Sequence, residues 1–445
     1  MACASVPGRD VHAAVRAVVG FALRVFYRLE VAGAGFPASG PLLLVGNHPN
    51  ALIDPALLLA VCPRPLTFLA KAPLFQLPAL GALLRALGAL PVQRRQDAGI
   101  DPSANAAVLE TGARELAAGR ALAIFPEGKS HSDPRLADMR SGAARMALAA
   151  RTAVQVAPVG LTYAEKGRFR STVHLEVGGP LAVAAVEQAT PAEVRALTGR
   201  IGEALRAVTL ELDAWEDLPL LSTAEALYAL RTAGPEADAE RRRLFARGMT
   251  LLREEQPGRY AALRAEVSAL DRRLKLVRAA PGDVVVHYRP ATVARFVGRN
   301  LLALLLGLPL AVVGLLLFLP WTLAVRGGLA AAHVEQDMLA TVKLLAALAL
   351  GPVYVLTLGA ATWRWLGPGW AVGLVVSALP LALFTRTFLA RRREALRDAR
   401  LFFQLGNRSA AKRQLIAEGE SLAARIETRV DESGPRVSAP ATTSP

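Results

Sequence analysis

A histidine and an aspartate lie six positions apart in segment 45–55, VGNHPNALIDP. Six positions along one helix would place the two side chains on different faces, so His48 and Asp54 can meet only if the residues between them form a loop. Pro49 and Pro55 favour such a loop. An imidazole held by a carboxylate is a general base, and it could take a proton from an alcohol that attacks a thioester.

These residues also allow a simpler interpretation. Asp54 could be only the N-cap of a helix with Pro55 at its first position, and His48 only a loop residue. On the residues of this segment alone, the two interpretations are about equally good.

A second polar segment, 125–131 (FPEGKSH), follows an apolar run that ends at Phe125. Glycine and serine in a loop that leaves a sheet can present N–H and O–H donors to an anion, which makes Gly128 and Ser130 candidate binding residues. Glu127 would repel a phosphate that it faced directly, so we expect it to bind a hydroxyl or to orient a neighbouring cation. The alternative is an ordinary turn.

Two further segments contain candidate residues. Arg94 and Arg95 follow a short apolar run, and Lys71 follows the run Leu66–Ala70. Arginine presents a planar fork that suits phosphate, although paired arginines in a solvated loop are the commoner case. The segment Val156–Tyr163, which contains Pro158, predicts a buried strand and by itself nothing more.

The elements that must position these residues alternate along the chain. Short apolar runs predict strands at Leu42–Val45, Leu66–Ala70, Leu122–Phe125 and Val156–Tyr163. Alanine- and leucine-rich stretches predict helices at Asn105–Ala118 and Gly142–Ala150. Alternation of this kind predicts an α/β domain over residues 40–185, with a mainly parallel sheet and covering helices.

The order and spacing of these segments resemble the phospholipid/glycerol acyltransferase superfamily. That family carries a His-(four residues)-Asp block, a block with Gly and Arg, a Phe-Pro-Glu-Gly block and a Val-Pro strand. Corresponding segments occur here in this order within residues 45–163. Five residues rather than four separate His48 from Asp54, and this form resembles the branch with fungal-type glycerol-3-phosphate/dihydroxyacetone-phosphate acyltransferases.

The resemblance implies a role for each matching residue. His48 would be the base and Asp54 would orient it. The implied substrate-binding residues are Arg94 and Arg95 on the acceptor phosphate, Glu127 and Gly128 in the acceptor pocket, and Pro158 near the acyl donor. Lys71 and Ser130 are predicted substrate-binding residues from their own segments. The implied donor is acyl-CoA or acyl-carrier protein, the implied acceptor a glycerol-phosphate-type alcohol, and no metal or cofactor is implied.

Composition and charge indicate which classes of binding partner the protein favours. The 445-residue chain is 53% hydrophobic and carries a net charge of +15, and its mean hydropathy is +0.33. A positive excess favours anionic lipids or phosphorylated substrates. The hydrophobic content and the lack of any recognisable nucleic-acid-binding pattern argue against nucleic acid. Cys3 and Cys62 form neither a metal-binding cluster nor a disulfide framework.

The remaining chain predicts a helical and membrane architecture. Residues 1–39 form an amphipathic helix and lead-in, 186–294 a helical connector, 295–390 a membrane domain with apolar segments 301–325, 344–363 and 365–384, and 391–445 a basic, partly disordered tail. Within 11–28, His12, Arg16, Arg24 and Arg28 share one side of a helix. That side could face lipid phosphates, or the helix could pack on its own domain.

Arginines flank the apolar region on both sides, with Arg295 and Arg299 before it and Arg391 to Arg393 after it. The positive-inside rule then places both flanks in the cytoplasm. We therefore expect 301–325, which contains two prolines, to bend or re-enter, and 344–384 to form a hairpin.

The sequence thus predicts an integral membrane acyltransferase whose catalytic domain faces the cytoplasm and which transfers an acyl group to glycerol-3-phosphate or 1-acylglycerol-3-phosphate. Another lipid acceptor, a hydrolase and a non-catalytic lipid-binding protein are the alternatives. The absence of a Gly-x-Ser-x-Gly segment lowers the case for a hydrolase.

Overall fold

The computed structural model describes residues 9–92, 102–229, 238–276, 290–331, 339–404, 413–414, 417–422 and 424–425. The chain divides into two compact units. We call Met1–Glu211 with Glu335–Val342 the sheet unit, and Leu212–Val334 with Lys343–Pro445 the helical unit.

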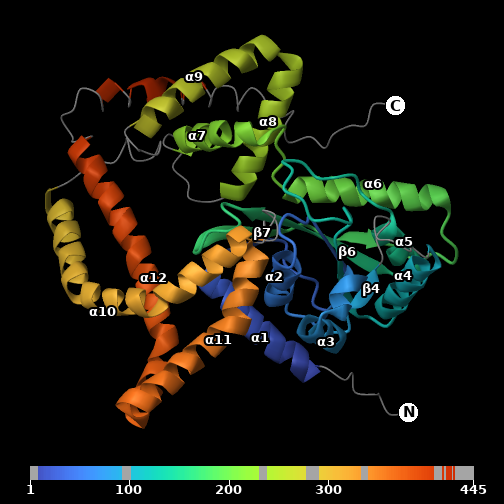
Figure 1. Cartoon of the computed structure of the whole chain (residues 1–445). Helices are drawn as coiled ribbons and strands as arrows, with labels where there is room; N and C mark the ends of the chain where they lie inside the picture. Colours follow the sequence, from blue (N-terminus) through green and yellow to red (C-terminus); the bar gives the residue numbers. More distant parts are fainter. Residues whose placement is uncertain are drawn as a thin grey trace. The chain divides into compact units, whose positions relative to one another are not determined.

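The sheet unit is built on an eight-stranded sheet with the order β1-β7-β6-β2-β5-β3-β4, in which β8 also pairs with β6 (Figure 1). The strands are β1 (Tyr27–Gly33), β2 (Leu42–Gly46), β3 (Leu66–Lys71), β4 (Leu90–Val92), β5 (Ala121–Ile124), β6 (Val154–Tyr163), β7 (Ser171–Val177) and β8 (Leu181–Val183). Strands β6, β2, β5, β3 and β4 run parallel to one another, and β7 and β8 run antiparallel to β6. The mainly parallel sheet predicted from the sequence is therefore present.

The first strand extends the sheet beyond the predicted domain start. β1 pairs in parallel with β7 along its whole length, from Tyr27 opposite Ser171 to Gly33 opposite Val177. Residues predicted to be only a lead-in thus supply an edge strand. Gly33 is required at that edge, because its φ is +98° and a Cβ there would lie 2.1 Å from the carbonyl oxygen of Val177.

Helices cover both faces of the sheet. They are α1 (Arg9–Phe26), α2 (Ile53–Val61), the short 3₁₀ helix η1 (Ala72–Gln76), α3 (Pro78–Ala86), α4 (Pro102–Ala117), α5 (Gly142–Ala149) and α6 (Pro191–Val208). α6 falls within the predicted connector but packs on the sheet. It begins at a capping box in which Thr190 and Glu193 each accept the other's backbone N–H.

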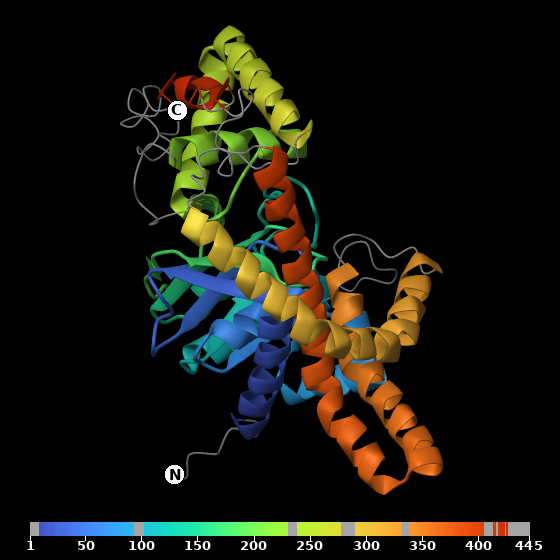
Figure 2. The ribbon, with the colours of Figure 1, turned by 90° about the vertical axis from the view of Figure 1, so that its left-hand side faces the viewer.

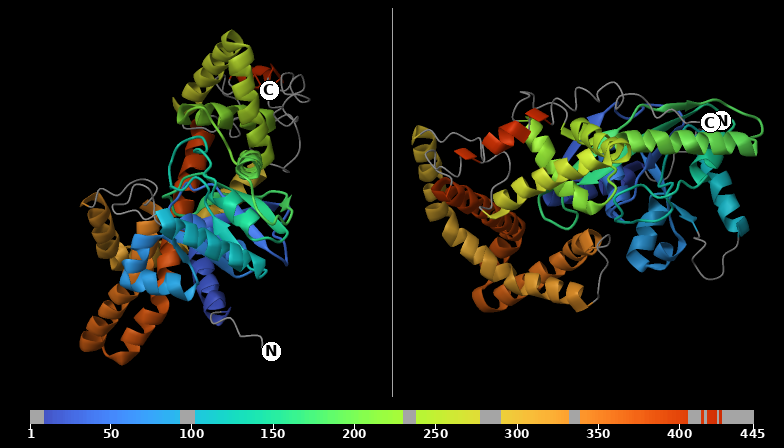
Figure 3. Two further views of the ribbon diagram at one scale, coloured as in Figure 1. Left: turned by 90° about the vertical axis from the view of Figure 1, so that its right-hand side faces the viewer. Right: turned by 90° about the horizontal axis from the view of Figure 1, so that it is seen from above.

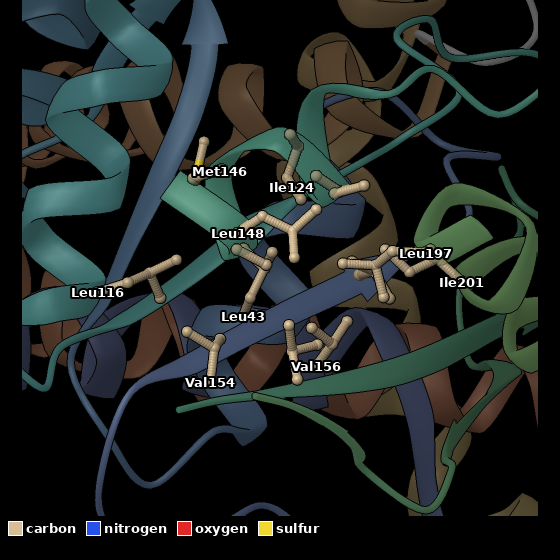
Figure 4. Close-up of a cluster of buried hydrophobic side chains, with 14 of the residues drawn as sticks. Leu43, Leu116, Ile124, Met146, Leu148, Val154, Val156, Leu197 and Ile201 are labelled. Carbon is tan, nitrogen blue, oxygen red and sulfur yellow. The ribbon is translucent and has the colours of Figure 1, made fainter. Parts of the chain in front are cut away.

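The main core lies between the sheet and α4, α5 and α6 (Figure 4). Side chains from β2, β5 and β6 meet those of the three helices, including Leu43, Leu122, Val156, Leu116, Met146 and Leu205, all fully buried. Each such side chain stabilises the fold by about 1.5–3 kcal/mol relative to leaving it exposed. This core fixes the central strands whose ends carry the candidate site.

The N-terminal helix α1 packs on its own unit. Leu23 is fully buried, His12 Nε2 hydrogen-bonds to the carbonyl of Leu87 at 3.1 Å, and Arg16 donates to the carbonyls of Cys62 and Pro63. Two of the four polar residues that could have faced lipid thus bind protein backbone. The structure favours the packed helix of the two interpretations left open by the sequence.

The helical unit begins with η2 (Trp215–Asp217), α7 (Leu218–Ala229), α8 (Asp238–Glu255) and α9 (Pro257–Leu276). Arg253 of α8 binds the carboxylates of Asp213 and Asp217, each at 2.6 Å. It also donates to the hydroxyl of Tyr260 on α9. Asp217 is buried, so these partners compensate its charge and join the start of the unit to α8 and α9.

Three long apolar helices follow: α10 (Pro290–Ala331), α11 (Leu339–Leu366) and α12 (Pro368–Gln404). Each contains a segment long and apolar enough to cross a membrane, at Gly298–Ala331, Thr341–Leu366 and Pro368–Arg393. The predicted apolar segments 301–325 and 344–363 fall within the first two, and the third span begins at Pro368, three residues after the predicted start of segment 365–384. α11 and α12 are joined at Gly367, whose φ is +92°, and form the hairpin drawn in orange in Figure 3.

α10 remains a single helix across Pro309 and Pro320, and Figure 2 shows it bending along its length. A proline cannot donate to the preceding turn. Near Pro320, the hydroxyl of Tyr354 donates to the carbonyl of Leu317 at 2.6 Å, which joins α11 to α10 at this point. The number of crossings and their orientation stay predictions.

α10 and α12 pack closely through glycines. A Cβ on Gly314 would lie 2.0 Å from Oγ1 of Thr385, and one on Gly307 would lie 2.7 Å from the ring of Phe388. Small residues that let two helices approach are typical of helix packing inside membranes.

Candidate active site at the carboxyl edge of the sheet

Because β2, β5, β3 and β6 are parallel, their carboxyl ends meet at one edge of the sheet. His48 follows the end of β2, Glu127 follows the end of β5, and Tyr163 is the last residue of β6. Lys71 ends β3, opposite Val92 in the register with β4. Segments far apart in the sequence therefore supply neighbouring side chains at this edge.

His48 and Asp54 form the pair that their spacing allowed. Nδ1 of His48 lies 2.8 Å from Oδ2 of Asp54, and the Asp54 side chain is completely buried while that of His48 is 14% exposed. Oδ2 also accepts the backbone N–H of Asn50 at 2.6 Å, and Oδ1 accepts the hydroxyl of Tyr163 at 2.5 Å. Three donors thus hold one buried carboxylate.

The predicted helix cap is wrong. α2 begins at Ile53 with Leu52 at its N-cap, so Asp54 lies inside the first turn and makes no cap. Pro55 is tolerated there because the first N–H groups of a helix have no intrahelical acceptor. The Asp54 side chain is therefore free of a capping role and points to the histidine.

The geometry leaves His48 ready to accept a proton. The Nδ1–H bond to Asp54 places the lone pair of a neutral imidazole on Nε2, which has no hydrogen-bond partner within the residues that the structure describes. The ring stacks on Phe125, with 4.2 Å between ring centroids and 13° between planes. Asn47 joins this loop to β6, exchanging two hydrogen bonds with the backbone of Leu161.

Glu127 joins the two polar loops. It is 2% exposed, and Oε1 accepts the backbone N–H of His48 at 2.9 Å. Oε2 accepts the N–H of Ala137 at 2.7 Å and contacts Nε2 of His131. The backbone N–H of His131 in turn donates to the carbonyl of His48 at 3.1 Å. Both carboxylate oxygens are therefore engaged within the protein.

The backbone conformation and a close neighbour both require glycine at position 128. Its φ is +71°, and a Cβ there would lie 2.7 Å from Nε of Arg140. The backbone N–H of Arg140 donates to the carbonyl of Pro126 at 2.9 Å. Arg140 and Lys129 are exposed on this loop, where they add positive charge.

The other predicted substrate-binding residues differ in how the structure places them. Ser130 belongs to the loop of Glu127, and Lys71 is exposed at the same sheet edge. Pro158 is buried within β6, opposite Val45 of β2, and its carbonyl accepts the N–H of Gly178. Arg94 and Arg95 lie outside the described residues.

Two tyrosines near the pair stay protonated. Burial, together with the negative charge of Asp54, raises the pKa of Tyr163 well above its ordinary value. Burial likewise raises the pKa of Tyr27. Each phenol is thus a donor at neutral pH, Tyr163 to Asp54 and Tyr27 to the carbonyl of Lys166.

Residues 28–162 match the family model described as Acyltransferase. The chain carries an acyltransferase-family domain. The matched residues include His48, Asp54, Glu127 and Pro158.

Individual relatives match the same region. The chain is 36% identical over 117 residues to glycerol-3-phosphate O-acyltransferase 2 of Saccharomyces cerevisiae, covering 24% of this chain and 16% of the relative. It is 30% identical over 138 residues to the chloroplastic 1-acyl-sn-glycerol-3-phosphate acyltransferase LPAT1 of Arabidopsis thaliana, covering 31% and 36%. An uncharacterized acyltransferase of Schizosaccharomyces pombe is 32% identical over 126 residues, covering 26% and 19%.

Among solved structures, the 1-acyl-sn-glycerophosphate acyltransferase PlsC of Thermotoga maritima matches with 21% identity and a TM-score of 0.34, covering 43% of this chain and 78% of that chain. The alignments span 16% to 36% of the length of the three sequence relatives. The likeness to those relatives is therefore local to the acyltransferase domain.

Sequence reasoning missed several residues of this site. Tyr163 was part of a predicted strand without a side-chain role, and Asn47, Asn50 and His131 were neighbours of candidates. A signal was available for Asn47, because a polar residue directly after the buried strand β2 must lie at the carboxyl edge. No local signal marked Tyr163, which contacts Asp54 across 109 positions of sequence.

Proposed function

We propose that the protein is a membrane-bound acyltransferase that transfers a fatty acyl group from acyl-CoA or acyl-carrier protein to a hydroxyl of glycerol-3-phosphate or 1-acylglycerol-3-phosphate. The observation that carries this proposal is the His48–Asp54 pair, held at 2.8 Å with Nε2 of His48 turned to accept a proton. The acyltransferase-family match over residues 28–162 supports the reaction class.

In the proposed reaction, Nε2 of His48 takes the proton of the acceptor hydroxyl while its oxygen attacks the carbonyl carbon of the thioester. A carbon–oxygen bond forms and a tetrahedral intermediate results. The carbon–sulfur bond then breaks, and the departing sulfur receives the proton from the His48 imidazolium. Asp54 stabilises that imidazolium and keeps the ring oriented throughout.

The choice of an anionic acceptor rests on charge and on the relatives. The chain carries a net charge of +15, and Lys71, Lys129 and Arg140 are exposed cations at or near the site. Arg94 and Arg95 are proposed as contacts of the acceptor phosphate, because guanidinium groups suit phosphate oxygens. The yeast and plant relatives are named for glycerol-3-phosphate and 1-acylglycerol-3-phosphate.

The membrane location is proposed from the helical unit. It contains three helices that are long and apolar enough to cross a bilayer. Arg295 and Arg299 near the start of α10, and the run Arg391 to Arg393 in the later part of α12, favour a catalytic domain on the cytoplasmic side. Both flanks share that side when α10 bends or re-enters and α11 and α12 form a hairpin. A membrane-bound enzyme would keep an acylated product in the bilayer that dissolves it.

The test uses membranes containing the full chain, a radiolabelled acyl donor and a panel of acceptors with and without phosphate. Wild type is expected to acylate a glycerol-phosphate acceptor, and His48→Ala to lose transfer by about 10²-fold or more. His174→Ala is a matched control. Its Nδ1 lies 2.9 Å from Oε2 of Glu30, in another histidine–carboxylate pair, which joins β7 to β1.

Retained transfer in His48→Ala would refute the assignment of the base. Release of free fatty acid without acylated product would identify a hydrolase instead. Product formed only with acceptors that lack phosphate would refute the roles proposed for Arg94 and Arg95.

A further inference from the structure

The last residue of β6 binds the carboxylate oxygen of Asp54 that His48 does not contact. Tyr163 donates its hydroxyl to Oδ1 of Asp54 at 2.5 Å. We infer that Tyr163 is a positioning residue, which fixes Asp54 and thereby sets the proton affinity of His48 in the proposed transfer reaction. This inference rests on the proposed function.

The bonds to Asp54 divide between its two oxygens. Oδ2 serves His48 and the N–H of Asn50. Oδ1 has Tyr163 as its hydrogen-bond partner among the residues that the structure describes. A buried carboxylate needs such donors, because an unmet acceptor away from water costs about 1–3 kcal/mol and more when charged. Tyr163 therefore completes the set of bonds that holds Asp54 in one orientation.

The phenol of Tyr163 is itself held in place. Its ring packs edge-on against Tyr27, with 5.8 Å between centroids. Tyr27 donates to the carbonyl of Lys166 and accepts from Nδ2 of Asn50 at 3.4 Å. Nζ of Lys166 donates to Ser132 on the loop of Glu127. Tyr27, at the start of β1, thus connects the ring of Tyr163 with both polar loops.

The bond from Tyr163 has a consequence for His48. A hydroxyl that donates to a carboxylate draws negative charge away from it, and the Asp54 charge is what stabilises the His48 imidazolium. Removing that hydroxyl concentrates the charge on Asp54. The imidazolium is then favoured, so deprotonation of His48 requires a higher pH.

Other ionisable groups surround this network. Glu127 contacts the backbone N–H of His48, His131 contacts Glu127, and Lys166 lies beyond Tyr27. None of these three hydrogen-bonds to the carboxylate of Asp54 within the described residues. A shift in the titration of His48 on loss of the Tyr163 hydroxyl therefore reports the bond to Asp54.

The test is Tyr163→Phe, which removes one oxygen and keeps the ring that packs on Tyr27. In the full chain reconstituted in membranes, kcat/KM for the acceptor is expected to fall by about 10-fold to 100-fold, as for loss of a bond to a charged group. The acidic limb of its pH profile is expected to move upward by about half to one pH unit. A purely structural role would lower activity or thermal stability and leave that limb in place.

A matched control is Tyr27→Phe, which removes a hydroxyl of the same network that makes no bond to Asp54. Its acidic limb is expected to stay at the wild-type pH. If Tyr163→Phe behaves in the same way, or keeps wild-type rate and profile, the inference is overturned.

A second measurement separates this inference from the proposed function. NMR titration of the His48 ring in the purified, histidine-labelled full chain needs no turnover. An upward shift of that titration in Tyr163→Phe supports the inference even if no acyl transfer is found, and an unchanged titration overturns it. Absence of product from wild type would refute the proposed function alone.

Discussion

Substitution of Glu127 tests whether the loop after β5 positions His48 in the loop after β2. The family resemblance places Glu127 in the acceptor pocket, whereas in the structure both of its oxygens are engaged by protein groups. Oε1 accepts the N–H of His48 at 2.9 Å, and Oε2 accepts the N–H of Ala137 at 2.7 Å and contacts His131. We expect Glu127 to act by fixing the backbone of His48.

The perturbation is Glu127→Gln, which keeps the size of the side chain but replaces one acceptor oxygen with an NH₂ donor. The remaining oxygen is expected to stay with Ala137 and His131, because it serves two partners there. The NH₂ group then faces the N–H of His48, donor against donor. Loss of a bond to a charged group costs about 1.5–3 kcal/mol, which corresponds to about 10-fold to 150-fold in rate at about 1.4 kcal/mol per factor of ten.

The assay measures kcat and KM for the acceptor separately. If Glu127 positions His48, kcat is expected to fall by the amount given above while KM for the acceptor changes little. Ser132→Ala is a control on the same loop, since it removes the hydroxyl that accepts from Nζ of Lys166 and leaves the Glu127 carboxylate in place. A variant whose KM rises steeply at unchanged kcat would refute this reasoning and return Glu127 to the acceptor pocket.

Two other substitutions test the surroundings of the site. Gly128→Ala is expected to destabilise the acyltransferase domain by more than Gly119→Ala. Both glycines have positive φ, which costs alanine about 1–2 kcal/mol, but only at Gly128 would a Cβ meet Arg140. Equal losses of thermal stability in the two variants would show that the contact with Arg140 is unimportant. Burial raises the pKa of the Glu211 carboxyl in the folded protein. The stability that the protonated carboxyl contributes is fully present below the ordinary pKa of 4.5 and is lost as pH rises through the pKa of Glu211 in the folded protein. Glu211→Gln, which can still accept the N–H of Leu136, is therefore expected to be more stable than wild type at neutral pH and to lose that advantage in acid, as measured by thermal unfolding against pH.

The central strands could be predicted from sequence for a physical reason. β2, β5 and β6 are buried on both faces, so they appear as continuous apolar runs. β7 alternates between buried and partly exposed residues, and β1 is exposed over most of its length. Neither gives a continuous apolar run, and β1 becomes a strand through its pairing with β7. That pairing is distant in sequence, so no local pattern revealed it.

The candidate site also has a part that the sequence predicts and a part that it does not. His48 and Asp54 lie in one segment, and their pairing could be predicted because few conformations of a short loop are available to them. The hydroxyl that completes the pair comes from β6, which reaches β2 only through the fold of the sheet. The partners of Glu127 were also hidden, because backbone N–H groups leave no trace in residue types. Sequence thus predicted the reacting group and missed what holds it.

The spacing of His48 and Asp54 can be understood from the backbone between them. Ala51 adopts a φ of +35°, a left-handed conformation that turns the chain sharply. The N–H of Ile53 then bonds to the carbonyl of Asn50 at 2.9 Å, and the N–H of Asn50 reaches the Asp54 side chain. The fifth intervening residue is thus absorbed in a turn before α2, so the wider spacing is compatible with an unbroken bond between His48 and Asp54. Because that turn ends on the same carboxylate that Tyr163 holds, Asp54 is fixed both by its own loop and by the sheet.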